Sequence, residues 1–308
     1  MKDKYFEMDR NEFLILQVLA SSWYGRKNIR ELARHLNKSW NTISGSVKSL
    51  MEKKLIDRDG GDFKIAKDND ASYCFKLFMD SMSFNNLEEN AQYIVSNTLH
   101  FAESIMQKYE SELLSLVIFG SVASGEANEK SDIDILIIIK EPSQKEKLTE
   151  IKTNMINKEH IRFENINIIT MSDKEFEKGY LIADDFIISI LSNNIIIKDD
   201  GFLKTFMQRE LFLPSRKIIS ERAQQLEDHS LLLLQMMEST TDQILKDEFY
   251  THLLMEARLK LLKKKMPVPI TKKDVIDNIR KIDKKIYEEM VNIDKGDIRK
   301  RVMAYVSS

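Results

Sequence analysis

The N-terminal part of the chain shows apolar residues at helical spacing, followed by a short alternating segment. Apolar side chains recur every three or four residues over 13–19 and 29–36, which predicts two helices. A third helix is expected after Ser39, whose hydroxyl suits an N-cap. Residues 55–65 then alternate around a pair of glycines, which predicts a β-hairpin. The expected order is three helices and a hairpin.

The centre of the chain holds short runs of β-branched residues, a pattern typical of buried strands. Two such runs cover 116–119 and 135–139, a third strand is expected over 161–171, and a closing strand near Ile197. Strands in the middle of a chain with helices on either side indicate a mixed α/β domain.

Helices are expected on both sides of these strands. Apolar spacing between Leu87 and Tyr109 predicts a long helix that leads into the first strand, whereas the polar stretch 68–90 is expected to be a linker and the start of that helix. Ser172 and Glu175 form the pattern of a capping box, which predicts a further helix start. From Phe202 onward the pattern is helical to the end.

Two carboxylates stand at the start of the second central strand. Asp132 and Asp134 are two positions apart, so their side chains project from the same side of the strand. Carboxylates held together repel each other unless a cation lies between them. Oxygen ligands of this kind suit Mg²⁺, which usually completes its coordination with waters and substrate phosphates. The pair is therefore a candidate metal site with a catalytic role.

A Gly-Ser turn precedes this pair along the chain. Gly120 allows backbone amides to approach an anion closely, and Ser121 adds a hydroxyl and an N–H group. Ten residues separate Ser121 from Asp132. The combined pattern, with a strand before each half, resembles the motif of the minimal nucleotidyltransferases in the DNA polymerase β-like superfamily. The resemblance covers roughly 100 residues, a length compatible with one small domain.

The resemblance implies a fold, a metal and a substrate. It implies that Gly120 and Ser121 bind the phosphates of ATP or another nucleoside triphosphate, and that Asp132 and Asp134 hold Mg²⁺. In that family a third carboxylate on a later strand usually completes the site. By alternation the matching position here falls on Asn167, which cannot take up a proton as a base. Three alternatives stay open: Glu164 substitutes, catalysis is slow, or the domain binds nucleotide without turning it over.

Composition and charge limit the remaining choices. The 308 residues allow two or three domains, and the single Cys74 excludes a disulfide within the chain. The start of the chain does not read as a signal peptide and the apolar runs are too short to span a bilayer, so we expect a cytoplasmic protein. Net charge is −2. Between Ser21 and Arg58, however, nine basic residues oppose three acids.

That basic segment resembles the winged helix-turn-helix regulators of bacteria and archaea, in which the third helix enters the major groove of DNA. The resemblance rests on residues 29–36, 41–44 and 50–56. Candidate contacts on the third helix and hairpin are Trp40, Asn41, Ser44, Lys48, Arg58 and Lys64. Further phosphate contacts are assigned to Arg26, Lys27, Lys38 and Lys54. A solvated helix face or a protein-binding module is the competing interpretation, since the third helix carries no Arg.

The sequence thus predicts a multi-domain α/β (α+β) protein. The expected parts are a winged helix over 1–70, a linker and long helix over 71–110, a nucleotidyltransferase core over 111–201 and a helical bundle over 202–308. In the C-terminal helices, Arg222 and His229 share only the loose spacing of the HEPN ribonuclease motif, and ordinary helix-surface residues explain them better.

Two functions remain at this point. One is Mg²⁺-dependent transfer of a nucleotide from a nucleoside triphosphate to a hydroxyl of a protein, an RNA or a small molecule, joined to DNA binding. The other is a DNA-binding regulator whose nucleotidyltransferase-like domain binds nucleotide with weak or no catalysis. A homodimer is left open, because winged-helix proteins that bind palindromes are usually dimers.

Overall fold

The computed structural model describes residues 8–125, 132–156, 166–211, 214–239, 243–264, 272–284, 286–288 and 290. The chain divides into two compact units. Unit 1 contains residues 1–180 and 186–210, and unit 2 contains residues 181–185 and 211–308. In the part of the chain that the structure describes, no helix combines the length and the apolarity needed to cross a membrane.

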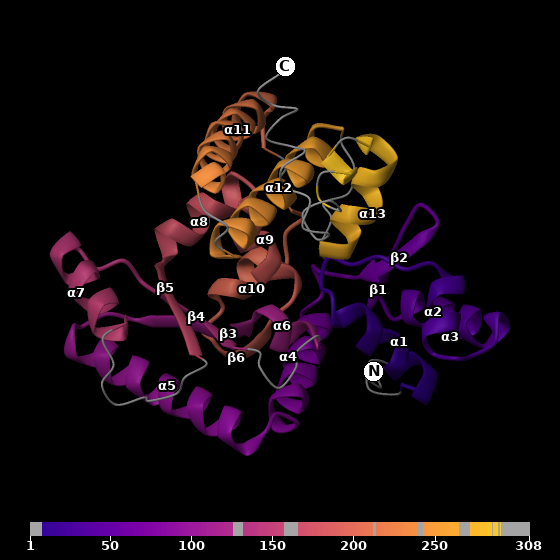
Figure 1. Ribbon diagram of the computed structural model, residues 1–308. Helices are drawn as coiled ribbons and strands as arrows, with labels where there is room; N and C mark the ends of the chain where they lie inside the picture. The colour runs from indigo at the N-terminus through magenta and orange to yellow at the C-terminus, as the bar shows by residue number, and fades with distance from the viewer. Residues whose placement is uncertain are drawn as a thin grey trace. The chain divides into compact units, whose positions relative to one another are not determined.

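Unit 1 begins with three helices and a hairpin, as the sequence predicts (Figure 1). These elements are α1 (Arg10–Ala20), α2 (Ile29–His35), α3 (Trp40–Glu52), β1 (Ile56–Asp59) and β2 (Asp62–Ile65). The Ser39 hydroxyl accepts the Thr42 N–H at 3.1 Å, so the predicted cap of α3 is present. Lys27 pairs with Phe63 and adds a short third segment to the antiparallel hairpin. The three helices enclose a small core of buried aliphatic residues, including Ile15, Leu32, Ile43 and Leu50.

The polar stretch after the hairpin is a helix rather than the expected linker. It forms α4 (Asp70–Asn85), followed by the long α5 (Glu89–Lys108). Lys76 and Asp80 on α4 are both buried and form an ion pair with each other. Lys76 Nζ also donates to the Asn194 carbonyl at 2.7 Å, and Asp80 Oδ2 accepts the Ile196 N–H at 2.9 Å. Buried polar groups of this helix therefore bind the central sheet, a use that hydropathy alone does not reveal.

The central sheet contains four strands in the order β5-β4-β3-β6. Their bounds are β3 (Leu113–Phe119), β4 (Ile133–Ile139), β5 (Ile166–Ser172) and β6 (Ile195–Asp199). β3 runs antiparallel to both β4 and β6, whereas β4 and β5 are parallel. The strands expected from the β-branched runs are all present. Residues 161–165 of the expected third strand lie outside the described residues.

The side chains of β4 alternate between the two faces of the sheet. Ile135, Ile137 and Ile139 of β4 pack into a core with α5 and with α7 (Lys145–Ile156), which cover this face in Figure 1. Because side chains alternate along a strand, Asp134 projects from the opposite face. One face of the sheet thus packs under α5 and α7, and the other, on which Leu136 and Ile138 are also buried, carries the carboxylate near the start of β4.

Three short helices complete unit 1. They are α8 (Asp173–Leu181), α9 (Asp185–Ser192) and α10 (Phe202–Met207), the first and second of which reach into the segment 181–185. The predicted capping box at the start of α8 is confirmed: Ser172 N–H donates to Glu175 Oε2 at 2.7 Å, and Glu175 N–H donates to Ser172 Oγ at 3.2 Å.

The described residues of unit 2 are mainly helical, as the spacing after Phe202 predicts. Its helices are α11 (Arg216–Ser239), α12 (Gln243–Lys263) and α13 (Lys272–Ile282). Leu233, Phe249, Leu253, Val275 and Ile279 lie in its buried core.

Candidate active site

The Gly-Ser turn and the carboxylates meet where β3 ends and β4 begins. β3 passes directly into the short helix α6 (Gly120–Ser124), and Phe119, the last residue of β3, is the register partner of Asp134. Gly120 has a φ of +73°, a left-handed backbone conformation that residues with a Cβ atom rarely adopt. A Cβ atom at Gly120 would overlap the Asp134 carboxylate at Oδ2. The glycine therefore allows the carboxylate to lie against the turn.

Asn167 holds the same carboxylate from the neighbouring strand. It is the register partner of Asp134 in the parallel pair β4–β5, so both side chains lie on one face. Asn167 Nδ2 donates a hydrogen bond to Asp134 Oδ1 at 3.1 Å. Alternation along the sequence places Asn167 beside the carboxylates, and the structure puts it there. Glu164, the other candidate for the third acidic position, lies outside the described residues.

The carboxylate pair carries uncompensated negative charge. Burial raises the pKa of the Asp134 carboxyl above its ordinary value, the hydrogen bond from Asn167 opposes this rise, and the charge of Asp132 adds to it. Asp132 is exposed directly before β4. Among the described residues, no Lys, Arg or His forms an ion pair with Asp132 or Asp134. Two neighbouring carboxylates without a basic partner fit a hard divalent cation such as Mg²⁺.

Ser121 lies at the second position of α6 and is partly buried, adjacent to Gly120. Its carbonyl accepts the Ser124 hydroxyl at 3.2 Å. Behind the turn, the Phe119 ring packs edge-on against Phe186 with ring centroids 5.3 Å apart. One side of the site is therefore apolar, and Gly120, Ser121, Asp132, Asp134 and Asn167 come together on the other.

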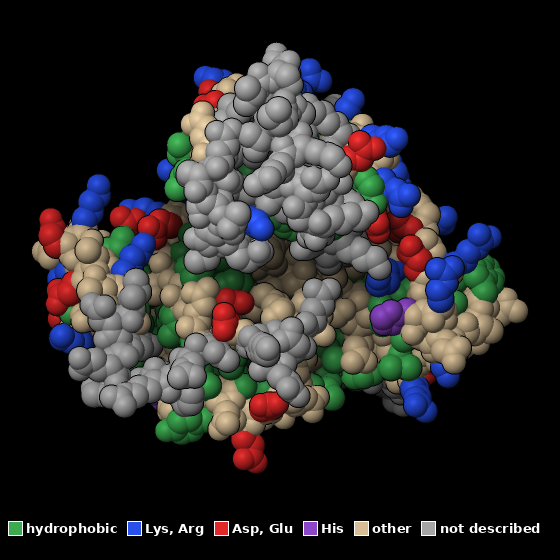
Figure 2. Space-filling view, viewed as in Figure 1, with side chains coloured by type: hydrophobic (Ala, Val, Ile, Leu, Met, Phe, Trp, Pro, Cys, Tyr) green, Lys and Arg blue, Asp and Glu red, His purple; other side chains and the backbone are tan. Residues whose placement is uncertain are grey.

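The residues predicted to contact DNA lie on α3 and on the hairpin. Trp40 is 53% exposed, Asn41 and Lys48 are exposed, and Ser44 is partly buried. In the space-filling view, Lys and Arg side chains lie over this part of the chain (Figure 2). Arg58 is on the hairpin, where its Nε donates to the Gly60 carbonyl at 3.0 Å.

Lys64 forms ion pairs that the sequence does not indicate. Its Nζ lies 2.7 Å from Glu210 Oε1 and 3.8 Å from Asp59 Oδ2. The partner Glu210 is 146 residues away along the chain, so no local pattern could predict the contact. Arg26 likewise pairs with Asp59 at 2.6 Å. Part of the positive charge counted in the sequence is thus neutralised within unit 1.

Arg222 has a structural position in unit 2. Its Nη1 donates to the carbonyls of Ile182 and Ala183 at 2.7 and 2.9 Å, and its Nη2 lies 3.6 Å from Asp185. These bonds fasten the segment 181–185 to α11. These contacts explain Arg222 as a residue that stabilises unit 2, without a role in a ribonuclease site.

Comparison with known proteins agrees with the central motif. The family model described as "Nucleotidyltransferase domain" matches residues 101–197. The chain is 28% identical over 133 residues to "Putative protein adenylyltransferase" of Methanocaldococcus jannaschii, an alignment that covers 42% of this chain and 83% of the relative.

A solved structure also matches part of the chain. It is spectinomycin adenyltransferase AAD(9) from Enterococcus faecialis with ATP and spectinomycin. The match has a TM-score of 0.34 and 13% identity, and it covers 67% of this chain and 99% of the other. The matched family model includes the Gly-Ser turn, both carboxylates and Asn167, and residues 101–197 are a nucleotidyltransferase domain.

Proposed function

We propose that this protein transfers the nucleoside monophosphate of a nucleoside triphosphate to a hydroxyl group, with ATP as donor and a protein side chain as acceptor. The observation that carries the proposal is the position of Asp134, held between Gly120 and Asn167 and next to Asp132. The donor and acceptor follow from the name of the archaeal relative.

The proposed roles follow from the chemistry of each group. Asp132 and Asp134 would hold Mg²⁺, which when bound neutralises phosphate charge and orients the transferred group. The turn at Gly120 lets the triphosphate approach the backbone, and Ser121 offers its hydroxyl and N–H to phosphate oxygens. The acceptor oxygen attacks the α-phosphorus, the bond to the β-phosphate oxygen breaks, and pyrophosphate leaves.

Asn167 affects the rate rather than the type of reaction. The acceptor hydroxyl must lose its proton as the new bond forms, and an amide cannot take that proton. Asn167 instead donates a hydrogen bond that favours the ionised form of Asp134, the form that binds a cation. We therefore expect slow transfer with intact binding of metal and nucleotide.

The test is transfer of label from α-³²P-ATP in the presence of Mg²⁺ and host lysate. The wild type is compared with the double variant Asp132→Asn/Asp134→Asn and with Asp200→Asn, an exposed carboxylate paired with Lys198 outside the site. The wild type and Asp200→Asn should label a protein band, and the double variant should not. Equal labelling by all three chains would refute the proposed site.

A second function is supported by the N-terminal elements. Three helices, a hairpin and the extended pair Lys27–Phe63 stand in the order of a winged helix-turn-helix, with Trp40, Asn41 and Lys48 exposed on its third helix. We propose that this surface binds DNA, with α3 as the element in the major groove.

DNA binding can be measured without reference to catalysis. Fluorescence anisotropy with labelled duplex DNA should show binding that weakens as salt increases, because phosphate contacts release counterions. No binding at low salt would exclude this function. DNA binding without label transfer, together with Mg²⁺-dependent ATP binding, would instead support a nucleotide-sensing regulator.

A further inference from the structure

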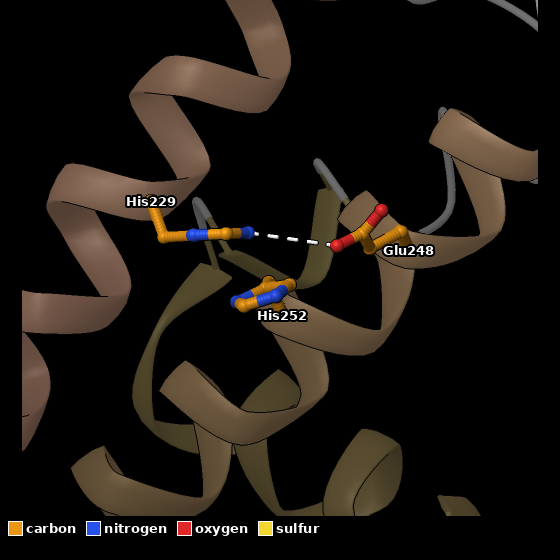
Figure 3. A group of neighbouring side chains, drawn as sticks. All are labelled: His229, Glu248 and His252. Atoms are coloured by element: carbon orange, nitrogen blue, oxygen red, sulfur yellow. Dashed lines mark ion pairs between the residues drawn. The ribbon is translucent and has the colours of Figure 1, made fainter.

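Two histidines and a glutamate converge in unit 2, outside the nucleotidyltransferase domain. His229 comes from α11, and Glu248 and His252 come from α12 (Figure 3). Residues four apart on a helix share one face, so Glu248 and His252 both point toward α11. His229 Nε2 lies 3.5 Å from Glu248 Oε1, and the two imidazole rings stack with centroids 4.4 Å apart.

The three side chains are close enough to share one ion. Each offers a ligand atom, and these atoms all lie within 4.8 Å of one another. Tetrahedral zinc with bonds of about 2.0–2.1 Å places its ligand atoms roughly 3.3 Å apart. To bind one zinc ion, the three ligand atoms would close from within 4.8 Å of one another to this spacing by changes of side-chain rotamer. His229 and Glu248 are 44% and 46% exposed, which leaves a path for the ion.

His252 supplies an independent sign that a partner is missing. Its Nδ1 is inaccessible to solvent and has no hydrogen-bond partner among the described residues. Burial lowers the pKa of His252 and the neighbouring His229 lowers it further, while Glu248 opposes the shift. A buried imidazole nitrogen without a hydrogen-bond partner is available to a metal ion.

We propose that His229, Glu248 and His252 form a zinc site that joins α11 to α12. Two imidazoles and one carboxylate are zinc ligands, whereas Mg²⁺ requires an all-oxygen set. Three protein ligands leave the fourth position to water. The site is chemically distinct from the carboxylate pair at Asp132 and Asp134, and it stands whether or not the chain transfers nucleotides.

The experiment is zinc titration of the full chain after treatment with EDTA, in competition with a chromophoric chelator. The wild type should bind one Zn²⁺ per chain at this site, and His229→Ala or His252→Ala should weaken that binding by about a hundredfold. Cobalt(II) in place of zinc should give the visible absorption of a four-coordinate ion. Zinc should also raise the temperature of thermal unfolding in the wild type and not in either variant.

Two matched variants separate this site from other binding. His100→Ala removes an exposed histidine that lies 3.9 Å from Glu103 on a single helix, and zinc affinity should not change. Asp132→Asn/Asp134→Asn should also keep the zinc site. The proposal is overturned if the wild type binds no zinc, if both histidine variants bind as the wild type does, or if only the aspartate variant loses the ion. If His252→Ala fails to fold, the half-exposed His229 still provides the test.

Discussion

The backbone at Gly120 adopts a φ of +73° and lies directly against the Asp134 carboxylate. Gly125 has the same φ, yet a Cβ there would meet nothing within 4 Å. Both glycines thus have the same positive φ, but only Gly120 lies in contact with Asp134. This pair separates the effect of backbone strain from the effect of close approach to Asp134, the side chain proposed to bind the metal.

We expect Gly120→Ala to weaken binding of Mg²⁺–ATP by about tenfold or more, equivalent to at least ~1.4 kcal/mol, because Asp134 must move. Gly125→Ala should cost only the strain of a left-handed residue, about 1 kcal/mol of stability. Isothermal titration with Mg²⁺–ATP measures the first effect and urea unfolding the second. Equal losses of nucleotide affinity in the two variants would show that the contact with Asp134 is unimportant.

Asn167 allows a gain of activity to be predicted. Asn167→Asp places a third carboxylate on the register partner of Asp134, where a base could accept the acceptor proton. We expect transfer to become roughly a hundredfold faster, the low end of general-base catalysis. The initial rate of label transfer from α-³²P-ATP checks this.

The matched control is Asn90→Asp, an exposed change in the first turn of α5. It should leave the rate unchanged. A rate for Asn167→Asp at or below that of the wild type would mean that the proton leaves by another route.

Part of this site could be predicted from residue types and spacing alone. The two-residue period places Asp132 and Asp134 on one side, and it places Asn167 opposite them on the next strand. The hydrogen bond from Asn167 to Asp134 and the contact with Gly120 were not predictable, because both depend on strand register and turn conformation. The pair Lys64–Glu210 is a tertiary contact without any local pattern.

At the scale of elements, α4 shows where periodicity fails. Its polar residues suggest a linker, yet Lys76 and Asp80 are buried against β6. They form an ion pair with each other and hydrogen bonds with the backbone of Asn194 and Ile196. The same stretch also carries apolar residues, of which Tyr73 and Phe75 are buried, so the linker interpretation gave too much weight to the polar residues between them. The strands and the long α5 were predictable because their burial rests on apolar side chains.

The Lys76–Asp80 pair predicts strong coupling between two substitutions. Asp80→Asn leaves the Lys76 ammonium buried without its counterion, and we expect a loss of about 3–5 kcal/mol of stability. The double variant Lys76→Met/Asp80→Asn should be more stable than Asp80→Asn alone. In the double variant no unpaired charge remains, and the amide oxygen introduced at position 80 can still accept the Ile196 N–H.

Tryptophan fluorescence in urea can follow this cycle, because both tryptophans, Trp23 and Trp40, lie in unit 1. Glu112→Gln breaks the exposed pair with Lys140 and serves as the control, with an expected cost of about 0–1 kcal/mol. Additive effects at Lys76 and Asp80 would show that the pair contributes no coupling.

At the scale of the whole molecule, the distribution of charge decides which cations are available to DNA. The net charge of −2 conceals a basic N-terminal segment. Within it, Lys48 on α3 is exposed, whereas Lys64, on the hairpin that follows, lies against Glu210. Burial would raise the pKa of Glu210, but hydrogen bonds from Lys64 and Lys67 lower it to about 2. Glu210 is therefore fully ionised at neutral pH and holds both lysines.

On the proposed DNA surface, Lys48→Ala should weaken binding and reduce the slope of log K against log salt by about 0.9, the value for one phosphate contact. Lys64→Ala should have a smaller effect, because Glu210 already neutralises that ammonium. Glu210→Gln should strengthen binding and increase the slope, since it releases Lys64 to contact a phosphate. Anisotropy titrations over a salt series provide the measurement, with the exposed Lys145→Ala on α7 as the unaffected control. If Lys64→Ala lowers DNA affinity as much as Lys48→Ala does, the ion pair between Lys64 and Glu210 opens when DNA binds. If Lys48→Ala leaves DNA affinity unchanged, α3 is not the contact surface.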